Sequence, residues 1–135
     1  MIFRPGWALH LLPALLSVGV VLYLGTEQKG ALTPAMDGGD KLGHFFAFAL
    51  VARTHARAFE FYLGPKAFKR AHVRGVVAAI AWGAILEIVQ SFLPYRSAEL
   101  ADLAADAAGA VCAGWVSVWL RSRGENSDDS AHRLH

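Results

Sequence analysis

A stretch of 22 residues near the start of the chain, residues 5–26, contains no formally charged side chain. A helix needs about 20 mostly apolar residues to cross the hydrocarbon core of a bilayer. His10 and Pro13 lie inside the stretch, and proline is tolerated in membrane-spanning helices. A cleaved signal peptide is the alternative, but the apolar run is longer than a typical signal and no small-residue cleavage site follows it. We therefore expect an uncleaved membrane-spanning helix.

Three further apolar segments follow, at residues 44–63, about 74–93 and about 100–120. The first of these is the weakest, because Arg53 and Arg57 interrupt it. A soluble four-helix bundle would carry polar residues along one face of every helix. The other segments are apolar nearly all round, and only 18% of the chain is charged, against about a quarter in ordinary soluble domains. We predict an all-α fold, a bundle of four transmembrane helices.

Four spans place both termini on one side of the membrane, and the basic residues sort by side. Ten of the 13 lysines and arginines fall on the side of the termini, and Lys29, Lys41 and Arg96 fall on the other. The positive-inside rule then predicts cytoplasmic termini and a multi-pass protein of the bacterial inner membrane. We expect residues 1–123 to form a single transmembrane domain and residues 124–135, which are polar and lack apolar periodicity, to form a disordered cytoplasmic tail.

This topology brings the ends of three predicted helices to the outer face, and each end carries ionisable or amide groups. Their spacing of three or four residues puts each pair on one helical face. Small residues continue the same faces, which predicts that these faces pack against other helices rather than against lipid. The net charge of +2 is too small to suggest a nucleic-acid partner. The predicted ligand-binding residues are Asp40, Lys41, His44, Glu87, Gln90, Arg96, Asp102 and Asp106.

Several of these residues also have a plain structural explanation. Asp40 and Asp102 lie at helix starts, where a carboxylate stabilises the positive end of the helix by about 0.3–1 kcal/mol. Arg96 could simply neutralise the acids. Glu87 and Asp106 are harder to explain in this way, because each lies inside a predicted span, where an ionised carboxylate costs about 2.5–3.5 kcal/mol. Ionisable groups at that depth indicate function.

The order of these motifs resembles the VanZ-like family of small bacterial membrane proteins. The resemblance rests on DKLGHF at residues 40–45, Glu87 with Gln90, Arg96, and DxxxDxxGA at residues 102–110, and it covers about residues 37–117. The family generally has asparagine where this chain has Asp106. The family takes its name from a protein linked to low-level resistance to the glycopeptide teicoplanin. The resemblance therefore implies a role in the cell envelope, at the outer face of the membrane.

Three classes of function remain open from the sequence. In the first, the protein is a binding or helper protein, and Lys41 and Arg96 contact the phosphate or carboxylate of a lipid head group or an envelope precursor. In the second, it is an enzyme in which Glu87 or Asp106 is a general base and His44 an acid or base. In the third, the cluster only stabilises the bundle.

Metal-assisted chemistry would use Asp40, His44, Glu87 and Asp106. These are plausible ligand types, but they match no diagnostic metal spacing. From the sequence we therefore predict neither a metal nor a cofactor, and we take the lipid bilayer as the main partner.

Overall fold

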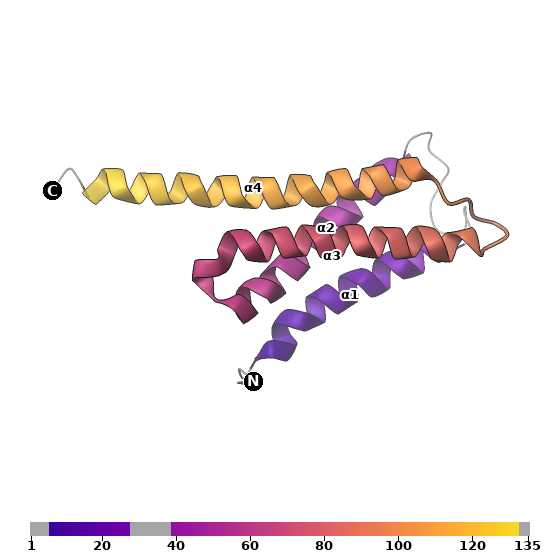
Figure 1. Ribbon diagram of the computed structural model, residues 1–135, viewed down its shortest axis with the longest axis horizontal. Coiled ribbons are helices and arrows are strands. Elements are labelled where there is room, and N and C mark those ends of the chain that lie inside the picture. The colour runs from indigo at the N-terminus through magenta and orange to yellow at the C-terminus, as the bar shows by residue number, and fades with distance from the viewer. Residues whose placement is uncertain (1–5, 28–38, 133–135) are drawn as a thin grey trace.

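The computed structural model describes residues 6–27 and 39–132, with side chains described at residues 9–27 and 40–124. In these parts of the chain the fold is all-helical, as predicted, and its long helices follow the four apolar segments (Figure 1). The elements are α1 (Trp7–Thr26), α2 (Gly39–Leu63), a short 3-10 helix η1 (Pro65–Ala67), α3 (Phe68–Ser91) and α4 (Leu100–His132).

Three of the helices are long and apolar enough to cross a membrane. The spanning stretches are Leu9–Thr26 in α1, Pro65–Ser91 in η1 and α3, and Leu100–Gly124 in α4. Helix α2, which contains Arg53 and Arg57, has no stretch that meets the same measure of length and hydropathy. Composition alone therefore supports a multi-pass membrane protein with three such helices, and it does not show the predicted fourth span.

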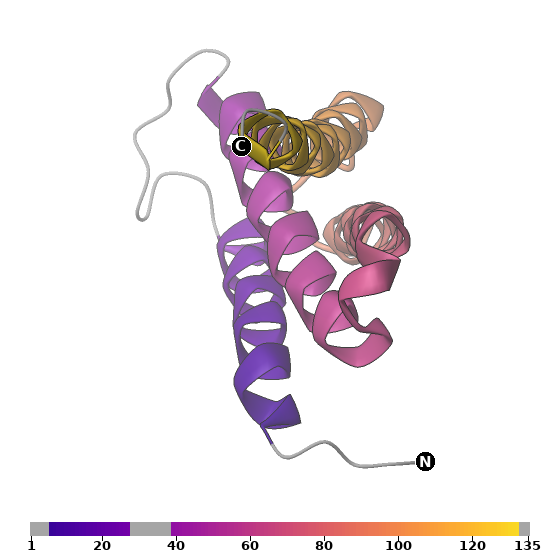
Figure 2. The same cartoon turned by 90° about the vertical axis from the view of Figure 1, so that its left-hand side faces the viewer.

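Helix α2 is nevertheless the centre of the bundle. It packs against α1, α3 and α4, whereas α1 makes only a small contact with α3 (Figure 2). The buried core runs along α2 through Phe48, Val51 and Ala52. One of its arginines also faces protein, because an Nη1 of Arg53 lies 3.1 Å from Nε2 of His72 on α3. The charges that lower the hydropathy of α2 therefore include one that contacts a neighbouring helix.

The outer surface of the bundle is rich in large apolar side chains, while several polar side chains are buried. On α2 the exposed residues Leu42, Phe46 and Leu50 are four apart and form one apolar stripe. The exposed apolar residues of the other helices include Leu9 and Leu15 on α1, Val73 and Val77 on α3, and Val111 and Trp115 on α4. Burial of polar groups behind an apolar exterior is the arrangement expected of a protein surrounded by lipid.

Small residues allow the helices to approach closely, as the sequence predicts. A side chain at Gly75 of α3 would lie 2.6 Å from the carbonyl oxygen of Ala52 on α2. A side chain at Gly109 of α4 would overlap the carbonyl oxygen of Phe45 on α2. Both contacts are with backbone, which cannot move aside without moving the helix. The glycines therefore set how close α3 and α4 lie to α2.

Helix α1 begins and α4 ends at the same end of the bundle, and the turn between α3 and α4 lies at the opposite end (Figure 1). Helix α4 continues as far as His132, well beyond the ends of its neighbours. The sequence predicts a disordered tail from residue 124, so the structure differs there. The physical reason is that extending an existing helix needs no new nucleus, and residues 124–132 contain no proline to stop it.

Candidate functional site

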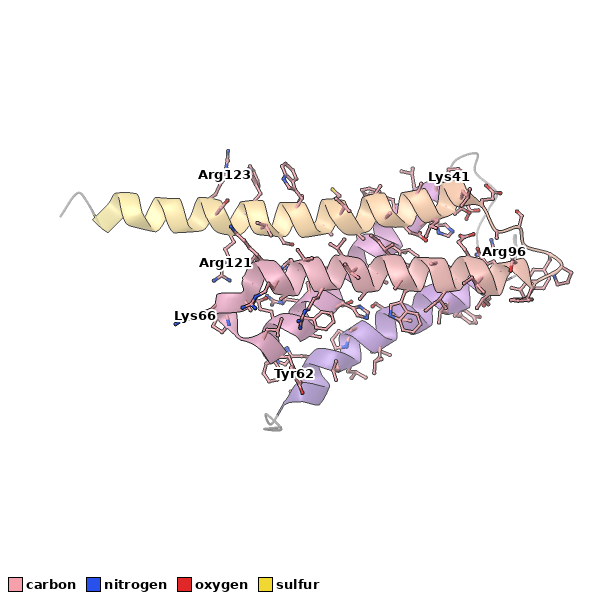
Figure 3. All side chains as sticks on the ribbon, in the orientation of Figure 1. Lys41, Tyr62, Lys66, Arg96, Arg121 and Arg123 are labelled. Carbon is pink, nitrogen blue, oxygen red and sulfur yellow. The ribbon has the colours of Figure 1, made fainter. Side chains whose placement is uncertain are left out.

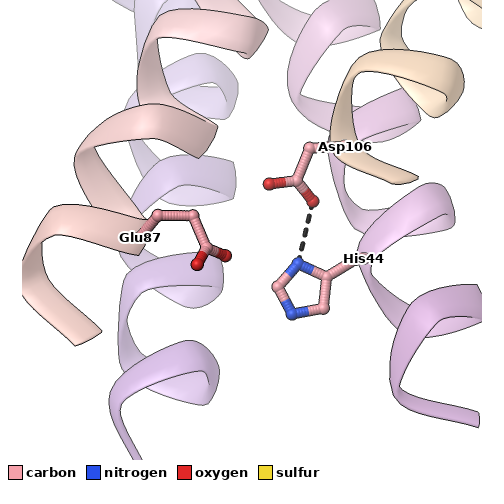
Figure 4. Close-up of side chains that lie close together, drawn as sticks. All are labelled: His44, Glu87 and Asp106. Carbon is pink, nitrogen blue, oxygen red and sulfur yellow. Dashed lines mark hydrogen bonds and ion pairs between the residues drawn. The ribbon is translucent and has the colours of Figure 1, made fainter. Parts of the chain in front are cut away.

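A histidine and an aspartate form a buried pair between α2 and α4. Nδ1 of His44 lies 2.8 Å from Oδ1 of Asp106 (Figure 4). Asp106 is fully buried and His44 largely so. The close approach of the two helices at Gly109, one turn further along α4, brings the two side chains into contact. The carboxylate therefore fixes the orientation of the imidazole ring.

Glu87 reaches this pair from the third helix. It lies on the buried face of α3, and one oxygen, Oε2, accepts a hydrogen bond of 2.8 Å from the backbone N–H of Glu99. Glu99 immediately precedes α4, so Glu87 stabilises the positive end of that helix. Its carboxyl group faces the space beside His44 and Asp106 (Figure 4). One atom from each of the three side chains lies within 4.8 Å of the other two.

A second pair of acids lies toward the rim of the cluster. The ammonium group of Lys41 lies 3.4 Å from a Glu99 oxygen and 3.5 Å from Oδ1 of Asp102. The carboxylates of Asp102 and then Glu99 raise the pKa of Lys41, so its ammonium stays charged. The other Asp102 oxygen lies 3.8 Å from Nε2 of His44. Asp102 therefore joins the rim to the centre, because it contacts both Lys41 and His44.

Two carboxylate oxygens at the centre of this cluster lack a hydrogen-bond partner among the residues that the structure describes. They are Oε1 of Glu87 and Oδ2 of Asp106, both buried. Oδ2 of Asp106 lies against Gly83 of α3, where a side chain would come within 2.7 Å of it. An unpaired buried acceptor costs free energy, and a charged one costs more. The arrangement therefore favours an occupant that brings positive charge or hydrogen-bond donors.

The remaining polar residues at this end form a separate group, which caps α1. Its donors bind carbonyl oxygens in the last turn of that helix or directly after it. Nε2 of Gln90 donates to Gly25 over 2.8 Å, and the hydroxyl of Tyr95 donates to Thr26 over 3.1 Å. Arg96 donates from Nη2 to the oxygen of Leu24 over 3.2 Å and from Nε to that of Glu27 over 3.0 Å.

These bonds satisfy carbonyl groups that a helix leaves unpaired at its C-terminal end. The positive charge of Arg96 also stabilises the negative end of the α1 dipole. Among the described residues, Arg96 therefore contacts the end of α1 and not the acids that the sequence suggested it could neutralise. Figure 3 shows Arg96 and Lys41 at the same end of the bundle. Their partners differ, because Arg96 donates to α1 and Lys41 contacts Asp102.

The structure thus divides the residues predicted from the sequence. It brings Lys41, His44, Glu87, Asp102 and Asp106 together, and we call these five residues the acidic cluster.

Gln90 and Arg96, which were also predicted to bind the ligand, lie instead in the α1 cap. Asp40 is exposed in the first turn of α2. Two participants were not predicted, Tyr95 in the cap and Glu99 beside the acidic cluster. Their place in the turn between two spans is the only signal that the sequence offers for them.

Comparison of the chain with protein-family models, with curated proteins and with solved structures finds no match. The geometry of the acidic cluster and the membrane character of the helices are therefore the features that bear on function.

Proposed function

We propose that this chain is an integral membrane protein that binds the polar head group of a membrane lipid or a lipid-linked envelope precursor at the acidic cluster. The observation that carries the proposal is the pair of buried carboxylate oxygens, on Glu87 and Asp106, that have no hydrogen-bond partner within residues 6–27 and 39–124. They lie between three helices at one end of an apolar bundle, at the level where lipid head groups meet water. Ionisable groups held at that depth are usually functional.

The charges of the cluster narrow what it can bind. Among the described residues, carboxylates on Glu87, Glu99, Asp102 and Asp106 lie within it or beside it, together with the cationic side chain of Lys41 and the imidazole of His44. A bare phosphate or carboxylate would be repelled, and the cations expected to attract one are engaged with the rim acids and with α1. An occupant that brings a cation or several hydrogen-bond donors fits these charges best.

The membrane placement is part of the proposal. Helix α2 would be the fourth span, because it is the central helix and its exposed stripe of Leu42, Phe46 and Leu50 suits contact with lipid. The basic residues then place both termini in the cytoplasm and the acidic cluster at the outer face. A reporter active only outside the cytoplasm is expected to be active in the loop at residues 94–99 and silent after Leu120. The reverse pattern would contradict the placement.

The setting that we propose is the inner membrane of a bacterium. The resemblance of the motifs to the VanZ-like family supports an envelope role, and an outward-facing cluster is accessible to lipids and precursors of the outer leaflet. The family generally has asparagine at the position of Asp106. The aspartate adds a negative charge, so the site in this chain favours a more positively charged ligand than a site with asparagine would.

Native mass spectrometry of the detergent-purified chain tests head-group binding. The wild-type protein is expected to retain lipids through a detergent wash, and the double variant Glu87→Gln, Asp106→Asn to lose them by about tenfold or more, equivalent to about 1.4 kcal/mol. Glu60→Gln is the matched control, because Glu60 is an α2 carboxylate that pairs with Arg121 at the other end of the bundle. Equal retention by all three proteins would contradict the proposal.

A second candidate function is catalysis on the same lipid-linked ligand. The observation in its favour is the contact between His44 and Asp106, because a carboxylate that orients a histidine is a common feature of general acid–base sites. Glu87 would then be the second proton-transferring group, across the space from the ring (Figure 4). Turnover of a bound lipid, detected as a changed mass in the wild type and not in His44→Gln, would distinguish catalysis from binding.

A further inference from the structure

We propose that His44, Glu87 and Asp106 bind a divalent metal ion, with zinc as the best-suited metal. The inference deepens the proposed function and rests on it for the location of the site, since the metal would be the positive charge that the acidic cluster lacks. It departs from the sequence prediction, which found no diagnostic spacing and expected no metal. The three ligands come from three different helices, which is why their spacing along the chain is uninformative.

The donor set suits the metal. One imidazole nitrogen and two carboxylate oxygens are ligands that zinc accepts, and three protein ligands with one open position are typical of catalytic zinc sites. A tetrahedral zinc with bonds of about 2.0–2.1 Å holds its ligand atoms roughly 3.3 Å apart. In the structure one donor atom of each residue lies within 4.8 Å of the other two. Small side-chain rotations would therefore complete the site.

The free oxygens give independent support. Oε1 of Glu87 and Oδ2 of Asp106 are buried without a hydrogen-bond donor within the described residues. Glu87 is 9% exposed and Asp106 is 0% exposed, so bulk water does not satisfy them. A divalent cation coordinates both oxygens and compensates two negative charges at once.

The surroundings hold the ligands in place. The second oxygen of Glu87 accepts the backbone N–H of Glu99, which orients the carboxylate from outside the site. Asp106 is held over Gly83, where no side chain competes for its free oxygen. Outer hydrogen bonds of this kind are typical of metal sites, because they fix the ligand orientation before the metal arrives.

A metal would also explain how an acid-rich cluster can receive an anionic head group. With three protein ligands, the open position could take an oxygen of a phosphate, whose charge the acids alone would repel. Lys41 at the rim, held by Glu99 and Asp102, would lie on the outer side of the same ligand.

The test uses the full chain, purified in detergent without a polyhistidine tag, stripped with a chelator and titrated with Zn²⁺ by calorimetry. We expect one zinc per chain, and a Co²⁺-substituted protein with the intense visible bands of a four-coordinate site. His44→Gln, Glu87→Gln and Asp106→Asn should each weaken binding by more than about 100-fold, the most that loss of an outer hydrogen bond costs. Each replacement is nearly isosteric, so folding can be checked separately by thermal unfolding.

Two controls carry the same residue types at the other end of the bundle. His72→Gln changes a buried histidine that contacts Arg53, and Glu60→Gln changes the acid that pairs with Arg121. Both should bind zinc as the wild type does. Binding weakened equally by the controls and by the cluster variants would overturn the site, as would an absence of stoichiometric metal in the stripped and reloaded protein.

The lipid measurement separates this inference from the proposed function. If the chain binds no zinc but still retains lipid through Glu87 and Asp106, the metal proposal fails and head-group binding stands, with protons or ligand donors satisfying the oxygens. If zinc binds but lipid retention is unaffected by metal or by the variants, the metal site stands and the head-group proposal fails.

Discussion

The α1 cap and the acidic cluster lie at the same end of the bundle, but their hydrogen bonds differ. The donors of the cap are paired with acceptors, whereas, within the described part of the chain, the cluster contains acceptors that are not paired with donors. In the cap, donors from Gln90, Tyr95 and Arg96 meet backbone carbonyl oxygens of α1, and one uncharged amide oxygen of Gln90 is left over. In the acidic cluster, two carboxylate oxygens are left without a donor among the residues that the structure describes.

The difference shows how to separate scaffold from site in a membrane bundle. A polar group that completes a helix end lowers the energy of the fold and needs nothing else. A group of buried acids with free oxygens raises that energy unless something binds there. Glu87 and Gln90 are only three residues apart on α3, yet they belong to different clusters, so a shared motif does not imply a shared role.

The largest expected loss of stability comes from separating α2 and α4 beside the acidic cluster. Gly109→Ala would place a methyl group on the carbonyl oxygen of Phe45 and push α2 away from α4. We expect a loss of about 3 kcal/mol or more, at the upper end of over-packing costs, and little folded protein in the membrane. Fluorescence-detected gel filtration measures the folded fraction. Gly43→Ala is the control, because a side chain there meets nothing within 4 Å, and wild-type behaviour of both variants would refute the close approach.

The next effect comes from breaking the cap. Arg96→Met keeps much of the length of the side chain but removes its donors to Leu24 and Glu27. We expect the free energy of unfolding to fall by about 2 kcal/mol, since hydrogen bonds from a charged donor contribute about 1.5–3 kcal/mol and this one is partly exposed. Thermal unfolding in detergent measures it, beside Lys69→Met as an exposed cation on α3. If both variants unfold alike, Arg96 does not hold α1.

A smaller effect is expected from a single hydroxyl in the same cap. Tyr95→Phe removes only the hydrogen bond to the carbonyl oxygen of Thr26. Because the residue is exposed, the loss should be near the lower end of the usual range, about 0.5 kcal/mol. Tyr62→Phe changes another exposed tyrosine, on α2, and serves as the matched control in the same unfolding experiment. A larger loss of unfolding free energy than that of Arg96→Met would mean that Tyr95, and not Arg96, contributes most to the stability of the α1 cap.

Much of the fold follows from the sequence because apolar length and small-residue spacing are local properties. The apolar segments mark the helices, and the four-residue spacing of Gly75, Ala79 and Gly83 marks the buried face of α3 that also carries Glu87. The meeting of His44, Glu87 and Asp106 could be predicted for the same reason, since each lies near the same end of its helix. Geometry on separate helices, not chain spacing, makes these residues neighbours.

The hydrogen-bond partners of long side chains and of backbone groups could not be predicted in this way. Arg96 can reach several helix ends, and only the path of the turn after α3 decides that it reaches α1. The backbone N–H of Glu99 donates to Glu87. Nearly every residue has such a group, so the identity of residue 99 does not indicate this contact. The central position of α2 could not be predicted either, because its charged residues lower its hydropathy. One of them, Arg53, contacts a neighbouring helix in the structure.

The most direct test of the account compares Glu87→Gln with Arg96→Met in thermal unfolding of the detergent-purified chain, with a chelator present throughout. If the acidic cluster is a binding site, glutamine keeps an acceptor for the N–H of Glu99, removes a surplus charge and adds a donor among the free oxygens. We expect a midpoint for Glu87→Gln equal to or above that of the wild type, while Arg96→Met unfolds at a lower temperature. A midpoint for Glu87→Gln as low as that of Arg96→Met would contradict it, because the carboxylate would then be part of the scaffold.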